Sequence, residues 1–168
     1  MSNRMGYILG ALSAALLVAA PPAMAKGQDM NKLAVEQSDM YGKYLVTGEG
    51  QAVYMFTADK QGSSESTCYS KCAEVWPPAT TAGAVTKEGE MVHERLIQTI
   101  ERKDGAEQLT YNGWPLYLFV RDTGAGGPTG QDVKGFGGEW YLVRPDGTKV
   151  SHQTAGESTG GGNMEGGY

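Results

Sequence analysis

The sequence contains few of the side chains that most often carry out catalysis or bind metals. It has two cysteines and two histidines in 168 residues. A Gly-x-Ser-x-Gly element and a His-Glu-x-x-His pair are both absent, and the Gly-rich stretch 123–130 is not followed by the Lys-Ser/Thr of a phosphate loop. These absences exclude serine hydrolases of the nucleophile-elbow type, zincin-type proteases and phosphate-loop enzymes, so no enzyme class is indicated.

Basic residues are in the minority. The chain has 14 Lys and Arg against 19 Asp and Glu, a net charge of −5. The basic residues form no stripe or run, which argues against nucleic acid and anionic membrane surfaces as partners.

Long apolar runs are also lacking, apart from one at residues 8–20. That run is too short to span a membrane, which takes about 20 residues. Arg4 precedes it and Ala23-Met-Ala25 follows, the pattern of a secretory signal peptide covering residues 1–25. We therefore expect a mature chain that starts at Lys26, is periplasmic or secreted, and is not inserted in a membrane. No lipobox cysteine stands at the cleavage point, so no lipid anchor is expected.

The composition divides the remaining chain into three parts. Residues 26–39 are polar and are expected to form a loose N-terminal segment. Residues 151–168 are rich in Gly, Ser and Thr, have little to bury, and are expected to be a disordered tail. Residues 40–150 are long enough for one modest core and are predicted to form a single domain.

A motif occurs twice within that domain. Tyr54-x-Phe56-x-x-Asp59 is matched by Tyr117-x-Phe119-x-x-Asp122, and a Trp follows each Asp at nearly the same distance, as Trp76 and Trp140. Such self-similarity indicates that the fold is built from two copies of one unit. We place the repeats at about 42–78 and 106–147, with an insert-like stretch at 79–94 between them.

The pattern of both repeats is that of β-structure. Strands are predicted at 44–47, 52–57, 95–102, 107–111, 114–120 and 139–144. The connections are a hairpin-like Gly48-Glu-Gly50 and two-residue turns at Asp104-Gly105 and Asn112-Gly113. The two motif strands are apolar on both faces, which predicts burial between two layers.

One short helix is predicted near the cysteine pair, at about 67–75, with Ser66 as its N-cap and Pro77-Pro78 as its stop. The predicted fold class is mainly β: a compact antiparallel β domain built from two pseudo-symmetric repeats, with this one helix.

Cys68 and Cys72 leave three readings open. In an exported protein a lone pair is most simply a disulfide, which would close a very small loop. Small, strained disulfides are more reducible, which leaves a redox role open. Copper is the other alternative, since thiolate and thioether ligands favour Cu(I); the available supplements are His93, His152, Met55 and Met91. We favour a structural disulfide and expect no cofactor.

Asp59 and Asp122 end their strands at equivalent positions. A carboxylate pair of this kind suits general acid–base work or cation binding. Alternatively, each Asp caps the loop that follows it by accepting backbone N–H bonds, and we favour this interpretation because no other acids cluster around either residue. The aromatic residues also have two readings, a surface for a planar ligand or a core; we favour the core. The tryptophans concerned are Trp76, Trp114 and Trp140.

Taken in order, these segments resemble a bacterial secreted-repeat family of predicted lipoproteins that carry the Tyr-x-aromatic-x-x-Asp motif. The resemblance covers about residues 42–147. Its most specific segments are Cys68-x3-Cys72 leading to Trp76-Pro-Pro78, and Tyr111-Asn-Gly-Trp-Pro-Leu-Tyr117. The missing lipobox cysteine departs from many relatives. The resemblance implies no biochemical activity, since the family has none established.

These observations predict an exported β-repeat protein that is a non-enzymatic binding or envelope-associated module. Its partner would be an unknown ligand or an envelope protein. The alternative is a periplasmic redox or copper-handling protein that uses Cys68 and Cys72.

Overall fold

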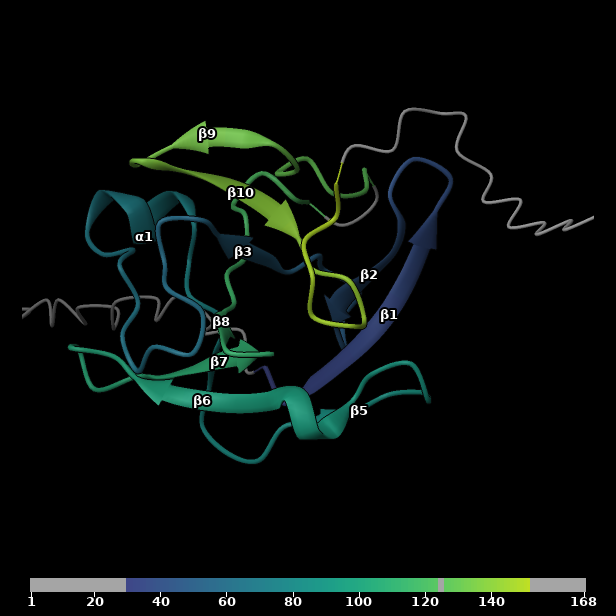
Figure 1. Ribbon diagram of the computed structural model, residues 1–168, viewed down its shortest axis with the longest axis horizontal. Coiled ribbons are helices and arrows are strands. Elements are labelled where there is room, and N and C mark those ends of the chain that lie inside the picture. The colour runs from purple at the N-terminus through teal and green to yellow at the C-terminus, as the bar shows by residue number, and fades with distance from the viewer. Residues whose placement is uncertain (1–29, 124–125, 152–168) are drawn as a thin grey trace, which may run out of the picture.

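A computed structural model describes residues 30–123 and 126–151 of the chain (Figure 1). The predicted signal peptide, residues 26–29, His152 and the segment predicted as a disordered tail lie outside these residues. The elements are β1 (Lys32–Ser38), β2 (Gly42–Thr47), β3 (Tyr54–Phe56), α1 (Lys71–Val75), β4 (Thr80–Thr81), β5 (Thr86–Lys87), η1 (Glu94–Leu96), β6 (Ile97–Glu101), β7 (Glu107–Tyr111), β8 (Trp114–Pro115), β9 (Val133–Gly135) and β10 (Gly138–Leu142). The mainly β fold with one short helix near the cysteines confirms the predicted fold class.

The strands form three small sheets. Their orders are β2-β1-β5, β3-β10-β9 and β4-β7-β6, with β8 also paired to β7. All pairs are antiparallel except β1 with β5. Figure 1 places the β1–β2 hairpin and the β6–β7 hairpin on two sides of a central region that contains β3, β8 and β10.

The two hairpins are equivalent parts of the two repeats. In the first, Gln37 is paired with Lys43 and Ser38 with Gly42. In the second, Glu101 is paired with Glu107, and the Arg102 N–H donates to Ala106 O over 2.9 Å. The hairpins therefore have the same register and loop length, and Ser38 occupies the position that Arg102 occupies in the other repeat.

Two clusters of buried side chains lie on opposite faces of the motif segments. Val53 and Met55 face a mainly aliphatic cluster, as do Leu116 and Leu118. Tyr54, Phe56, Tyr117 and Phe119 face a mainly aromatic one. The prediction that these segments are buried on both sides is confirmed, except at Val120, which is 51% exposed.

Several predicted boundaries were wrong. The segment expected to be loose contains β1, because Leu33 is buried and the strand pairs with β2 from Leu33 to Ser38. The strand predicted at 114–120 is regular only at β8, since Pro115 has no amide donor and Tyr117 pairs in turn with Pro78 and Tyr54. The strand predicted at 95–102 begins as the 3-10 turn η1.

The helix and one turn also differ from the prediction. Helix α1 begins after Ser70 rather than Ser66, and Ser66 makes buried contacts elsewhere. The turn at Asn112-Gly113 has positive φ at both residues, as a type I′ turn requires. At Asp104-Gly105 only the glycine has positive φ (80°), which gives a three-residue loop instead.

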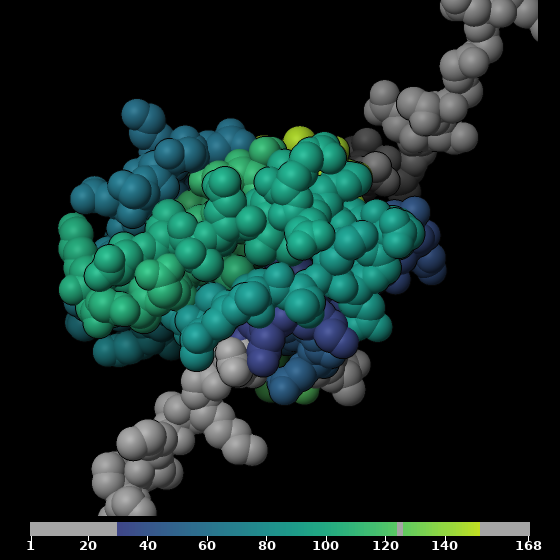
Figure 2. All heavy atoms as spheres, turned by 90° about the horizontal axis from the view of Figure 1, so that it is seen from below, coloured from purple at the N-terminus to yellow at the C-terminus, as the bar shows by residue number. Residues whose placement is uncertain are grey.

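The segment between the repeats covers part of the aliphatic cluster. Ala79 and Val92 are buried in that cluster, and Glu88 donates its N–H to Leu33 O over 2.8 Å. Figure 2, viewed from below, shows that this segment and β6 (teal) make up much of that face. The stretch 79–94 is thus part of the fold and ties β1 to the second repeat.

Candidate functional site

The two motif tyrosines meet at the centre of the pseudo-symmetry. The N–H of Tyr54 donates to Tyr117 O, and the N–H of Tyr117 donates to Tyr54 O, both over 2.9 Å. Each motif segment then pairs with the Trp-containing segment of the other repeat. Phe56 is the register partner of Trp140, and Val120 donates its N–H to Val75 O over 3.2 Å. The repeats therefore exchange strands.

The tyrosine hydroxyls cross between the repeats in the same way. Tyr54 donates to Oδ2 of Asp122 over 2.5 Å, and Tyr117 donates to Oδ2 of Asp59 over 2.6 Å. The tyrosine of each motif is thus bound by the aspartate of the other. Short O–H···O⁻ bonds of this kind are stronger than bonds between neutral groups.

The other oxygen of each aspartate caps the loop that follows. Oδ1 of Asp59 accepts the N–H and the hydroxyl of Thr67, both over 2.7 Å. Oδ1 of Asp122 accepts the equivalent pair from Thr129, over 2.8 and 2.7 Å. This geometry is that of a loop cap, and it commits both oxygens of each aspartate to internal contacts. The two carboxylates serve two separate loops.

Four aromatic rings form one stack between the repeats. Trp76 and Trp140 are parallel at the middle with centroids 4.0 Å apart, Phe56 stacks on Trp140 at 4.0 Å, and Phe119 stacks on Trp76 at 4.1 Å. Tyr54 meets Trp76 edge-on and Tyr117 meets Trp140 edge-on. Trp76 and Trp140 are 1% and 0% exposed, so these tryptophans form no binding surface; Trp114 is half-buried against the aliphatic cluster.

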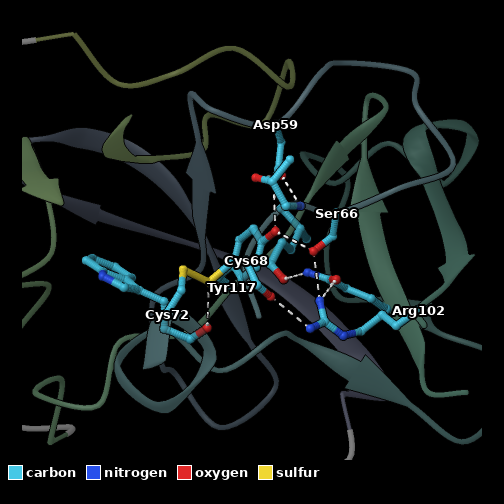
Figure 3. Close-up of a disulfide and its surroundings, with 10 residues drawn as sticks. Asp59, Ser66, Cys68, Cys72, Arg102 and Tyr117 are labelled. Atoms are coloured by element: carbon cyan, nitrogen blue, oxygen red, sulfur yellow. Dashed lines mark hydrogen bonds between the residues drawn. A yellow bond between two sulfur atoms is a disulfide. The ribbon is translucent and has the colours of Figure 1, made fainter. Parts of the chain in front are cut away.

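A buried arginine fills the space beside the Asp59–Tyr117 pair (Figure 3). Nη1 of Arg102 donates to Ser66 Oγ over 2.8 Å and to Gln108 Oε1 over 2.6 Å, and Nη2 donates to Cys68 O over 2.9 Å. The Ser66 hydroxyl lies 2.9 Å from the Tyr117 oxygen. Because the tyrosine proton is used on Asp59, the serine donates this bond, and a chain of hydrogen bonds links the guanidinium to the carboxylate.

The equivalent space in the other repeat has no arginine. By hairpin register, Ser38 is the residue equivalent to Arg102, and Tyr44 is equivalent to Gln108. Pro128, which precedes Thr129, is equivalent to Ser66, which precedes Thr67. A hollow of about 30 Å³ remains beside Asp122. Its lining residues are Glu36, Tyr44, Gly50, Gln51, Ala52, Asp122, Gly127 and Pro128.

Cys68 and Cys72 form a disulfide, as predicted, with Cα atoms 5.2 Å apart. It lies at the start of α1, against the aromatic cluster, and its sulfurs belong to residues only 0% and 7% exposed. The carbonyl of Cys68 is the one held by Arg102, so the bridge and the buried arginine form one structural unit (Figure 3).

The residues considered as additional copper ligands do not lie together around the disulfide. His93 precedes η1, Met55 lies in the aliphatic cluster, Met91 is 43% exposed, and His152 lies outside the described residues. Within residues 30–123 and 126–151, no three His, Cys, Asp or Glu side chains are placed to hold a metal ion.

The sequence analysis did not identify three residues of this site, Arg102, Ser66 and Gln108. The partners of the two aspartates, Thr67 and Thr129, could have been predicted from the repeat, because each follows its motif Asp at a similar distance along the chain. Arg102 carries no such signal, since the hairpin of the first repeat has a serine in its place.

Burial and carboxylate partners raise the pKa of several tyrosines. Burial, with the hydrogen bond to Asp122, raises the pKa of Tyr54, and burial, with the charge of Asp59, raises that of Tyr117. The hydrogen bond to Glu139 raises the pKa of Tyr141 to about 12. In each case the neutral hydroxyl is the form that the fold stabilises.

We expect these tyrosines to stay protonated at pH values where an ordinary tyrosine, with a pKa of about 10, ionises. Because the pKa is higher in the folded state, the stability they contribute is complete below about pH 10 and is lost as the pH rises through the folded values. Tyrosinate absorbance and far-ultraviolet circular dichroism followed together should show late ionisation accompanying unfolding. In Tyr141→Phe the step near pH 12 should disappear. Ionisation of all tyrosines near pH 10 in a folded protein would contradict this.

The family described as a secreted repeat of unknown function, Lipoprotein_15, matches the chain twice, at residues 37–80 and 98–144. The two matches coincide with the two strand-exchanged repeats. No curated protein and no solved structure matches. Of the part of the chain that the structure describes, no helix has the length and apolar character needed to cross a membrane.

Proposed function

The chain belongs to this family of secreted repeats of unknown function, and from that premise we propose that it is an exported, non-enzymatic binding module that associates with a component of the cell envelope. The observation that carries the proposal is the difference between the two equivalent sites. Beside Asp59 the buried Arg102 donates to Ser66, whereas beside Asp122, in the repeat without this arginine, a hollow lined in part by Glu36 and Tyr44 remains. A repeat fold that completes one site from its own chain and leaves the other open suits the binding of a ligand group.

The residues that the sequence suggested as catalytic, redox or cation-binding candidates are bonded to other residues of the same chain. Asp59 and Asp122 are bound by tyrosine and threonine donors, and the disulfide is buried. These contacts support a scaffold role for the motif residues, with recognition at the hollow and the loops around it.

The experiment is retention of the purified mature protein by isolated cell envelopes of the organism that makes it. We expect saturable co-sedimentation that is competed by an excess of unlabelled protein. Retention that is absent, or that rises linearly without saturation, would overturn the proposal.

Removal of the disulfide distinguishes this binding function from the redox or copper-handling alternative. Changing both Cys68 and Cys72 to Ala should lower the free energy of unfolding by about 2 kcal/mol, because the bridge closes a very small loop. Urea unfolding measures that change, and envelope retention should be the same as for the wild type. Loss of retention in a folded variant, ready reduction of the bond by a glutathione buffer, or tight one-to-one Cu(I) binding by the reduced protein would favour the alternative.

A further inference from the structure

Strand β6 has one edge that pairs with no other strand of the described residues. It is the outer strand of the β4-β7-β6 sheet, and Figure 1 shows it on the outer side of β7. The carbonyl of Leu96 and the N–H of Arg102 bond to the β7 side of the hairpin, over 2.8 and 2.9 Å. Because bonding directions alternate along a strand, the backbone groups that point away from β7 are those of Ile97, Thr99 and Glu101.

The equivalent edge of the first repeat is covered by the chain itself. The shared hairpin register places Leu33 of β1 and Ile97 of β6 at equivalent positions. Strand β5 pairs in parallel with β1 there, and Glu88 donates its N–H to Leu33 O over 2.8 Å. The internal repeat thus shows that this edge of the unit accepts an extended segment, and the second repeat supplies none from the described part of its own chain.

Local contacts close both ends of the free edge and leave two donors between them. Ile97 donates its N–H into η1, and Lys103 donates its N–H to the Tyr69 hydroxyl over 3.3 Å. The N–H groups of Thr99 and Glu101 have no acceptor among the described residues, and both residues are exposed. An exposed edge of this kind is a template for a further strand.

The pattern of free groups on this edge is complementary to itself. In an antiparallel pair of two β6 strands with Thr99 opposite Thr99, each Thr99 N–H reaches the Thr99 carbonyl of the other copy. Each Glu101 N–H likewise reaches the Ile97 carbonyl of the other copy, which also has no donor of its own. Both free donors of each copy are then bonded, and every paired residue lies within the regular strand Ile97–Glu101. Such a contact is isologous, as a two-fold symmetric dimer requires.

The charges beside the edge fit the same pairing. Arg95 and Glu101 are both exposed, and neither has an ion-pair partner within 4.0 Å among the described residues. In the antiparallel pair Glu101 is opposite Ile97 of the other copy and diagonal to its Arg95, a separation that long side chains can bridge. Strand β6 contains no Pro and no Lys, two residues that commonly protect a free edge from pairing.

We propose that β6 is a homodimer interface, at which two copies of the chain pair antiparallel about Thr99 and join their four-stranded sheets into one continuous sheet. The overlap of five residues is short. It buries less than the roughly 1,000 Å² of a stable interface, so we expect a weak dimer with a dissociation constant on the order of 0.1 mM. The dimer goes beyond the proposed envelope binding and does not depend on it, but it would present two copies of any binding surface and strengthen retention through avidity.

The first test is sedimentation velocity of the mature protein, with NMR spectra over the same concentrations. We expect the sedimentation coefficient to rise from the monomer value towards the dimer value as the concentration passes about 0.1 mM. The amide signals of Thr99 and Glu101 should shift along the same curve, because their N–H groups exchange water for a carbonyl of the second copy.

Replacing Thr99 by Pro should abolish the dimer. The change removes one of the two free donors of each copy, and the hairpin is kept because this N–H does not bond to β7. Thr99→Val keeps the amide and is the matched control, which should dimerise as the wild type does. If Thr99→Pro fails to fold, the charges supply a second test: Glu101→Lys should weaken the dimer about five-fold, and adding Arg95→Glu to it should restore the wild-type constant.

Cysteine cross-linking tests the register of the pairing. In the antiparallel pair the Cα atoms of the two copies of Thr99 lie about 5.5 Å apart, within the range of a disulfide. Thr99→Cys should therefore form a covalent dimer on mild oxidation. Gln98→Cys is the matched control on the same exposed strand, since Gln98 is opposite Ile100 of the other copy and its own counterpart lies more than about 7 Å away.

Four results would overturn the inference: a sedimentation coefficient independent of concentration, an undiminished dimer in folded Thr99→Pro, equal cross-linking of the two cysteine variants, or concentration-dependent shifts confined to amides outside β6. Envelope retention that is lost in Thr99→Pro while the wild type stays monomeric would assign this edge to a strand of another protein and also overturn the dimer. Saturable retention of a protein that never dimerises would leave the proposed function standing without it.

Discussion

Separated into its two repeats, the chain is expected to lose its fold completely. Fragments 26–89 and 90–168 each contain one motif tyrosine, one motif aspartate and two rings of the stack, but the Tyr–Asp hydrogen bonds and the contacts between stacked rings all join one repeat to the other. A fragment alone would expose half of the four-ring stack and leave its tyrosine without the carboxylate. We expect poorly dispersed NMR spectra and no cooperative thermal transition from either fragment.

The control is the mixture of both fragments at equal concentration. Because the contacts are between repeats, mixing should restore dispersed signals and the stacked-tryptophan near-ultraviolet circular dichroism. Cutting the intact chain after Gly89, in the turn that follows β5, should leave the two parts associated. A stable, well-dispersed spectrum from the first fragment alone would contradict strand exchange as the basis of the fold.

Replacing Asp59 by Leu is expected to lower the free energy of unfolding by about 3–5 kcal/mol. The change leaves the Tyr117 hydroxyl and the Thr67 N–H without acceptors in a site where Asp59 is 5% exposed, and each buried unsatisfied group costs about 1–3 kcal/mol. Since a domain of this kind has about 5–15 kcal/mol in total, urea unfolding should show a much lower midpoint.

Asp59→Asn and Asp122→Leu are the matched comparisons. The asparagine keeps an acceptor for Thr67 and should cost only about 1–2 kcal/mol. Asp122 is half-buried, so water can reach the groups that its loss leaves unpaired, and Asp122→Leu should cost less than Asp59→Leu. Equal costs at the two positions, or loss of cation binding in Asp59→Asn with an unchanged melting temperature, would contradict the structural role of Asp59.

Much of the architecture could be predicted because its signals are local. Alternation of side chains along a strand assigned Val53 and Met55 to one face and Tyr54 and Phe56 to the other, and the two clusters confirm it. The repeat itself predicted two equivalent units, and the spacing of Cys68 and Cys72 in an exported chain predicted their bond. The loop-cap role of both aspartates also came from their place at a strand end, although their tyrosine partners did not.

The errors arose where a distant partner decides the local structure. Residues 32–38 look polar in sequence, yet they form a strand because their backbone pairs with β2. Ser66 has the chemistry of an N-cap, but Arg102 and Tyr117 compete for its hydroxyl, and the helix starts later. Pro115 interrupts the ladder of the second motif strand, which then pairs with two different segments.

The sequence by itself determined that the protein consists of two copies of one β unit with aromatic and aspartate positions in common, because period and spacing are properties of the chain. Only the tertiary structure decided that each tyrosine binds the aspartate of the other copy, and that Arg102 is buried beside Asp59 while Ser38 stands at the equivalent position of the other repeat. Hydrogen bonds and ring stacking act across a few ångströms of space whatever the sequence separation. Two positions that look unrelated along the chain therefore became equivalent only when the hairpins carrying them were folded to the same register.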